Sequence, residues 1–131
     1  MASVVVAFSV GLLAGAVIFG GRGPDLAAAA TAMRDGMRDS AGLLEVVGIE
    51  YEEALAAGPG STEFQAAHSN LARSRERWSS VAGPLAQIDP ARAAAISDGF
   101  DTLSSQIDTL APLPDVQTTI STLRTALTGT T

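Results

Sequence analysis

The sequence predicts an all-α protein: an N-terminal membrane helix or signal segment, followed by an antiparallel four-helix bundle. Three observations predict it. Residues 2–21 are mostly apolar and carry no charged side chain. Beyond them, apolar residues recur at helical steps of three, four and seven, and Gly and Pro clusters divide this pattern into four segments. We therefore expect an anchor or signal segment in residues 1–22 and a bundle domain in residues 23–131.

The N-terminal apolar segment has two interpretations. About 20 helical residues match a hydrocarbon core of about 30 Å, as an uncleaved transmembrane anchor requires. The alternative is a secretory signal peptide, with Val4–Leu13 as its apolar stretch and Ala14–Ala16 as its cleavage site. The length of the run favours the anchor, and the basic start of a signal peptide is missing.

The location of the bundle also has two interpretations. A signal peptide or signal anchor places the bundle outside the cytoplasm, and this is the location that we expect. A cytoplasmic bundle is the alternative, because Arg22 follows the apolar run and no Lys or Arg precedes it.

The composition excludes several function classes. The chain has 14 acidic and eight basic residues and a net charge of −6, so we expect no nucleic-acid partner. It has no Cys, which removes thiolate metal sites and cysteine nucleophiles. With one His and no phosphate-binding loop or hydrolase motif, we expect no enzyme.

The first two helices of the bundle are predicted from residue 26 onward. Gly58-Pro59-Gly60 should end the first helix. Ser61 or Thr62 should cap the second helix, and Gly83-Pro84 should end it. The expected core positions of the first helix are Leu26, Ala30, Met33, Met37, Leu44, Val47, Tyr51 and Leu55. Those of the second helix are Phe64, Ala67, Leu71, Ser74, Trp78, Val81 and Leu85.

Asp89-Pro90 is a strong signal for the start of the third helix, because a capping carboxylate precedes a proline at the first helical position. Pro112 and Pro114 should end this helix, and Asp115 should open a short fourth one. The expected core positions of the third helix are Ala93, Ile96, Phe100, Leu103, Ile107 and Leu110. Those of the fourth helix are Val116, Ile120, Leu123 and Leu127.

An acidic group on the first helix is the candidate metal site. Glu45 and Glu52 are seven residues apart and therefore share a helix face. Carboxylates of bundle helices, helped by a histidine, bind iron or another hard cation. The candidate ligands are Glu45, Glu50, Tyr51, Glu52 and His68. The Glu-x-x-His motif of di-iron bundles is absent, and the alternative is a solvated helix face.

The segment from Leu43 to Gly58, followed by Glu63-Phe64, resembles the helical extracytoplasmic region of bacterial high-affinity iron permeases. That region has a similar run of two leucines, an aliphatic residue, an acidic residue before Tyr, an Ala before Val or Leu, and a Gly. A Glu-Tyr or Glu-Phe pair then opens its next helix. Glu50 and Tyr51 match this run best, and Glu45 matches it less closely. The Arg-Glu-x-x-Glu motif of the permease pore is missing. The resemblance therefore implies an accessory domain in iron uptake.

Together, these observations predict a membrane-tethered, extracytoplasmic helical bundle. We expect it to act as a binding or accessory module in the uptake of iron or another cation, with a membrane protein as its partner. The alternative is a single-span structural subunit that docks on a larger membrane complex. Gly11 and Gly15 have the small-xxx-small spacing that lets membrane helices approach closely.

Overall fold

Four helices form the part of the chain that this computed structural model describes, residues 23–129. They are α2 (Gly23–Ala57), α3 (Thr62–Ile88), α4 (Pro90–Asp108) and α5 (Leu113–Thr128). No strand occurs in residues 23–129, which confirms the prediction of an all-helical bundle. None of these four helices is long and apolar enough to span a bilayer. The predicted anchor or signal segment, residues 1–22, lies outside the described residues.

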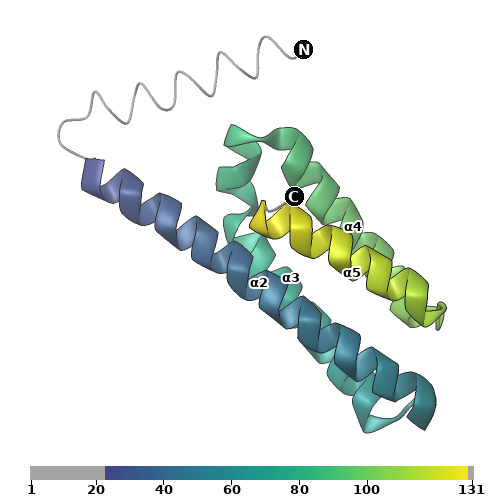
Figure 1. The fold of residues 1–131 in the computed structure, drawn as a ribbon. Helices are drawn as coiled ribbons and strands as arrows, with labels where there is room; N and C mark the ends of the chain where they lie inside the picture. Colours follow the sequence, from purple (N-terminus) through teal and green to yellow (C-terminus); the bar gives the residue numbers. More distant parts are fainter. Residues whose placement is uncertain (1–22, 130–131) are drawn as a thin grey trace.

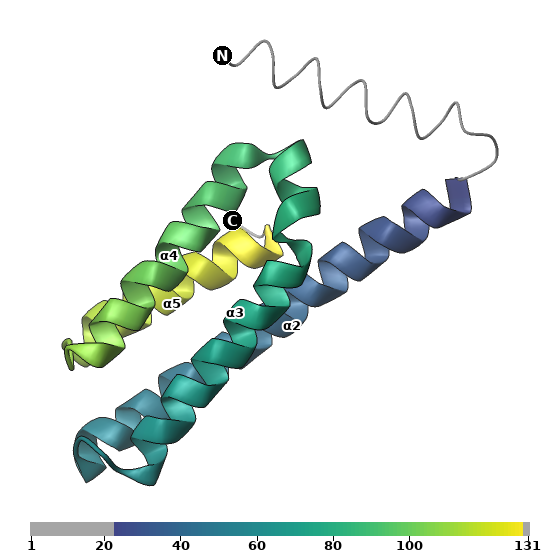
Figure 2. The same ribbon diagram turned by 180° about the vertical axis from the view of Figure 1, so that it is seen from behind.

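The helices run antiparallel in sequence order, and each packs against two others. α2 contacts α3 and α5, and α4 also contacts α3 and α5, so the four helices close into a ring (Figure 1). α2 has 35 residues and is about 52 Å long. It begins beyond the other helices (Figures 1 and 2). We call the end of the bundle at which α2 begins the proximal end. The α2–α3 and α4–α5 connections lie at the opposite, distal end.

The core consists of the predicted apolar stripes with few exceptions. The buried residues that were expected from the sequence are Met37, Leu44, Val47 and Tyr51 of α2; Ala67, Leu71, Ser74, Trp78, Val81 and Leu85 of α3; Ala93, Ile96, Phe100, Leu103 and Ile107 of α4; and Val116, Ile120, Leu123 and Leu127 of α5. Met33 and Phe64 are partly buried against this core. The spacing of the apolar residues therefore assigned most of the inner face of each helix correctly. Leu26 and Ala30, which were also expected in the core, are only half-buried and lie outside it, because α2 begins beyond the other helices.

The predicted caps hold the starts of α3 and α4. Ser61, not Thr62, is the N-cap of α3, and its hydroxyl accepts a 3.2 Å hydrogen bond from the backbone N–H of Phe64. The carboxylate of Asp89 accepts a 3.1 Å hydrogen bond from the N–H of Arg92 at the start of α4. Gly58 has a φ of 99° and ends α2 as predicted.

The prediction that Gly83-Pro84 ends the second helix is wrong. α3 continues through both residues to Ile88, because Leu85 is buried in the core and Asp89 provides the next cap. Pro84 lacks an N–H and its ring opposes the preceding turn, a combination that bends helices. Figure 2 shows that α3 changes direction over its last turns.

Three smaller predictions are also corrected. Leu55 is 39% exposed, and Ala54 occupies the inner face of α2 in its place. Leu110 lies after the end of α4, with a φ of 55° and 41% exposure, because the chain already turns toward α5 there. α5 begins at Leu113, not at Asp115, since Pro114 is tolerated in a first turn that needs no N–H donor there.

Small and polar residues allow the helices to approach closely. The hydroxyl of Ser40 donates to the carbonyl of Ser74 over 2.9 Å, and the hydroxyl of Ser74 donates to the carbonyl of Ser40 over 2.8 Å. Both serines are fully buried, and this reciprocal pair satisfies both hydroxyls. It fixes where α2 crosses α3.

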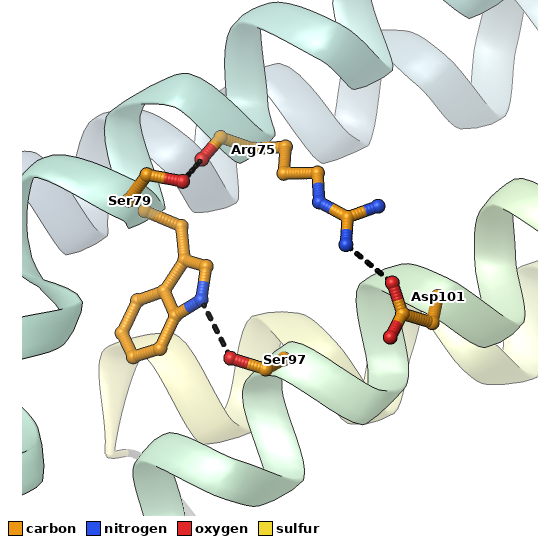
Figure 3. Close-up of polar contacts among 5 residues, drawn as sticks. Arg75, Ser79, Ser97 and Asp101 are labelled. Carbon is orange, nitrogen blue, oxygen red and sulfur yellow. Dashed lines mark hydrogen bonds and ion pairs between the residues drawn. The ribbon is translucent and has the colours of Figure 1, made fainter.

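Polar contacts also join α3 to α4. The indole N–H of Trp78 donates to the hydroxyl of Ser97 over 3.2 Å, and Arg75 pairs with Asp101 one turn away (Figure 3). Trp78 is 3% exposed, so its hydrogen bond removes the cost of burying an indole N–H. The Arg75–Asp101 pair lies at the surface.

Candidate functional site: an arginine-lined groove

Tyr51, one of the predicted metal ligands, is fully buried in the core. Its hydroxyl donates a 2.6 Å hydrogen bond to the carbonyl of Ala111 in the α4–α5 connection. Burial raises the pKa of this phenol above its ordinary value. The side chain therefore has a structural partner and is kept in its neutral form.

The other predicted metal ligands lie on two sides of the bundle. Glu45 and Glu52 line one shallow hollow of about 250 Å³ between α2 and α5, where Arg124 donates to Glu45 over 3.1 Å. His68 lies instead toward α4, with its Nε2 3.5 Å from Asp108 and its ring against Phe64. Glu50 is half-buried. Within residues 23–129, no group of three or more His, Cys, Asp or Glu side chains is placed to hold a metal ion.

A larger groove lies at the proximal end, where α2 runs past the end of α5. It has a volume of about 770 Å³, within the range of small-molecule sites. We call it the arginine groove. Its lining residues are Met33, Arg34, Met37 and Arg38 of α2, Arg92 of α4, and Ser121, Arg124, Thr125, Leu127 and Thr128 of α5.

The charge of the arginine groove contrasts with that of the whole chain. Four of the eight basic residues of the chain line it, and none of the 14 acidic residues does. Met37 and Leu127 are almost fully buried, so they form an apolar base beneath the guanidinium groups. A groove of this kind combines an apolar surface with donors for a carboxylate or phosphate.

Arg92 is held in place by the end of α5. Its Nε donates to the carbonyl of Ala126 over 2.6 Å and its Nη2 to the carbonyl of Leu127 over 3.1 Å. Gly129 has a φ of 69°, and a Cβ there would come within 3.2 Å of the guanidinium. Glycine thus permits both the turn and the close approach. The hydrogen bonds to Ala126 and Leu127 use two of the five N–H donors of Arg92. Its positive charge lies at the negative end of the α5 dipole, which is a favourable arrangement.

The other three arginines are weakly paired or have no carboxylate partner. Arg38 lies 4.0 Å from Asp35, and both side chains are mostly exposed. Arg124 pairs with Glu45 at 3.1 Å, again at the surface. Arg34 has no carboxylate partner among residues 23–129. Exposed ion pairs of this kind contribute about 0–1 kcal/mol, so an arriving anion competes with them readily.

The sequence alone did not reveal the arginine groove. Its four arginines come from three helices and span ninety positions of the chain, from Arg34 to Arg124. One signal was present: each arginine is adjacent in sequence to a predicted core residue, as Arg34 is to Met33 and Arg92 is to Ala93. Such positions lie at the edge of a buried stripe, but only the arrangement of the helices brings them together.

In comparisons with protein-family models, characterised proteins and solved structures, nothing matches this chain. The resemblance to iron permeases therefore stays a prediction, and the function is argued from the bundle and its groove.

Proposed function

We propose that this chain is a non-enzymatic binding module, tethered to a membrane by residues 2–21, that holds an anionic group of its ligand in the arginine groove. The observation that carries this proposal is the gathering of four arginines around one groove in a chain whose net charge is −6. Guanidinium groups bind carboxylate and phosphate oxygens through paired, charge-assisted hydrogen bonds.

Thermal unfolding of the full-length chain in micelles of a neutral detergent tests the proposal. Sodium phosphate is compared with sodium chloride at equal ionic strength. At a phosphate concentration tenfold above Kd, binding would raise the free energy of unfolding by about 1.4 kcal/mol. For a domain of this size, that is a shift of several degrees in Tm.

Matched arginine variants separate groove binding from general salt effects. Phosphate strengthens apolar burial in every protein, so a shift in the wild type alone decides nothing. The double variant Arg34→Gln/Arg38→Gln should lose the additional shift. The control Arg73→Gln/Arg77→Gln removes two exposed arginines of α3 outside the groove and should keep it. An equal phosphate response in all three proteins would contradict the proposal.

Cation binding by the acidic face of α2 is a second candidate function. This candidate is supported by the position of Glu45 and Glu52, which line the same hollow together with Gln117. Carboxylate and amide oxygens suit hard cations. The guanidinium of Arg124 at Glu45 competes for the same oxygens, so we expect weak binding. Calorimetry with manganese should show binding that the variant Glu45→Gln/Glu52→Gln loses, and no saturable binding in the wild type would exclude this candidate.

Docking onto a larger membrane complex is the competing function that the sequence predicts. Co-purification of the full-length chain with such a complex, undiminished by Arg34→Gln/Arg38→Gln, would favour docking over ligand binding.

A further inference from the structure

The charges of the described residues are distributed unevenly along the long axis of the bundle. Dividing each helix at its midpoint, the distal halves carry eight carboxylates and one arginine, Arg73. The proximal halves and the α3–α4 connection carry six carboxylates and six arginines, with Arg75, the midpoint residue of α3, counted among them. The net negative charge of the described residues therefore lies at the distal end, and the arginine groove lies at the proximal end.

We infer that the anionic group in the arginine groove is the phosphate of an anionic lipid, one with a net negative charge, at the surface of the membrane that residues 2–21 enter. This inference rests on the proposed function, because it names the ligand of the same groove. An anionic lipid surface attracts basic side chains within about a Debye length and repels carboxylates. The charge distribution of the bundle thus directs the groove toward the membrane and the distal end away from it.

The protruding part of α2 is suited to lie close to lipid. Between Gly23 and Arg34, Asp25 is the only acidic residue, and Ala27, Ala28, Ala29 and Ala32 are exposed. The lining of the groove is also suited to lipid. Its guanidinium groups can bind the phosphate, while the partly buried Met33 offers apolar surface to the adjoining part of the lipid.

Helix length determines how the bundle must lie on the membrane. Along α2, Arg34 lies about 16 Å and Arg38 about 22 Å from Gly23. The headgroup region on each side of the hydrocarbon core is only about 6 Å thick. An upright α2 would hold the groove above the lipid phosphates. The inference therefore requires α2 to lean toward the membrane, with the side formed by α2 and the end of α5 facing the lipid.

Hydrogen–deuterium exchange of the full-length chain in lipid nanodiscs tests this inference. Discs of phosphatidylcholine alone are compared with discs that also contain phosphatidylglycerol. Residues 33–38 and 121–128 should exchange more slowly in the anionic discs, by about fivefold for each arginine that binds lipid. Residues 41–57 at the distal end should exchange equally in both discs. High salt should reduce the difference, because it screens the attraction.

The variant Arg34→Gln/Arg38→Gln should exchange at the same rate in both discs, while Arg73→Gln/Arg77→Gln should behave like the wild type. Equal exchange of the wild type in the two discs would overturn the inference. Slow exchange of the groove residues in both kinds of disc would also overturn it if the Arg34→Gln/Arg38→Gln variant exchanged equally slowly.

Three separate additions to the phosphatidylcholine discs distinguish failure of the lipid inference from failure of the proposed function. The additions are phosphatidylglycerol, inorganic phosphate and a polyglutamate peptide. If inorganic phosphate slows exchange in the groove and phosphatidylglycerol does not, the groove binds soluble anions and the lipid inference is wrong. If a polyglutamate peptide alone slows exchange, the groove binds an acidic protein segment and the lipid inference is wrong. If none of the three slows exchange, both the inference and the proposed function are wrong.

Discussion

The hydroxyl of Tyr51 donates a 2.6 Å hydrogen bond to the carbonyl of Ala111, sixty residues later in the chain. This contact joins the last third of the longest helix to the connection between α4 and α5. Ala111 itself donates its N–H to the carbonyl of Gln106, so the connection is held from both sides. Tyr51 therefore fixes the α4–α5 pair against α2 at the distal end.

Replacing Tyr51 with Phe should destabilise the bundle by about 1–2 kcal/mol. The ring remains in the core, but the carbonyl of Ala111 loses its partner. A fully buried acceptor left unsatisfied costs about 1–3 kcal/mol, and Ala111 is half-buried, so we expect the lower part of this range. Urea unfolding followed by circular dichroism measures the change. A midpoint equal to that of the wild type would show that water replaces the hydroxyl without cost.

The same residue should give the protein a measurable pH dependence in the alkaline range. Burial raises the pKa of Tyr51 above 10.0 in the folded state. The folded protein therefore holds the phenol proton more tightly than the unfolded chain does. The resulting stabilisation is complete below pH 10 and is lost as the pH rises through the folded-state pKa. Because the chain has no Lys and no other Tyr, the free energy of unfolding should fall more steeply above pH 10 in the wild type than in Tyr51→Phe. Equal slopes would contradict the assignment.

Two glycines inside helices should respond in opposite ways to alanine. At Gly42 of α2, an added Cβ would meet nothing within 4 Å. Gly42→Ala should therefore stabilise the protein by about 0.5–1 kcal/mol. At Gly99 of α4, a Cβ would lie 2.5 Å and 2.9 Å from carbons of Leu123. Overpacking costs about 1–3 kcal/mol, so Gly99→Ala should destabilise the protein by about 1 kcal/mol net. Chemical denaturation of both variants checks the order of their stabilities. A stabilising Gly99→Ala would mean that the side chain of Leu123 moves aside at no cost.

The inner and outer faces of α3 should differ sharply in their sensitivity to truncation. Trp78 is 3% exposed, and Trp78→Ala should destabilise the bundle by about 3–5 kcal/mol. Arg75 pairs with Asp101 at the surface, so Arg75→Ala should change stability by about 0.5 kcal/mol or less. Urea melts of the two variants provide the comparison. Equal midpoints would mean that α3 is rotated relative to the structure described.

The sequence predicted the helices because each relies on local signals. Heptad spacing identified core positions such as Phe100 and Leu123, and the Asp89-Pro90 pair marked the start of α4. Predictions were wrong where tertiary packing outweighed a local signal. The burial of Leu85 carries α3 through Gly83-Pro84, and the turn toward α5 excludes Leu110 from the core.

The candidate site could be predicted from the sequence only in part. Sequence spacing correctly indicated that Glu45 and Glu52 share a helix face, but it could not show that Arg124 of α5 pairs with Glu45. The sequence analysis assigned Tyr51 both to the core and to a metal site, and the fold places Tyr51 in the core. The arginine groove depends on contacts between helices far apart in sequence, which no local pattern encodes.

Nuclear magnetic resonance of the full-length chain in neutral micelles tests the central claim, anion binding in the arginine groove, most directly. The side-chain Nε–H signals of the arginines are followed while sodium phosphate replaces sodium chloride at constant ionic strength. The signals of Arg34, Arg38, Arg92 and Arg124 should shift and reach saturation together, while those of Arg73, Arg75 and Arg77 should stay in place. Shifts that do not saturate, or that are equal for the four groove arginines and the three arginines of α3, would contradict the claim.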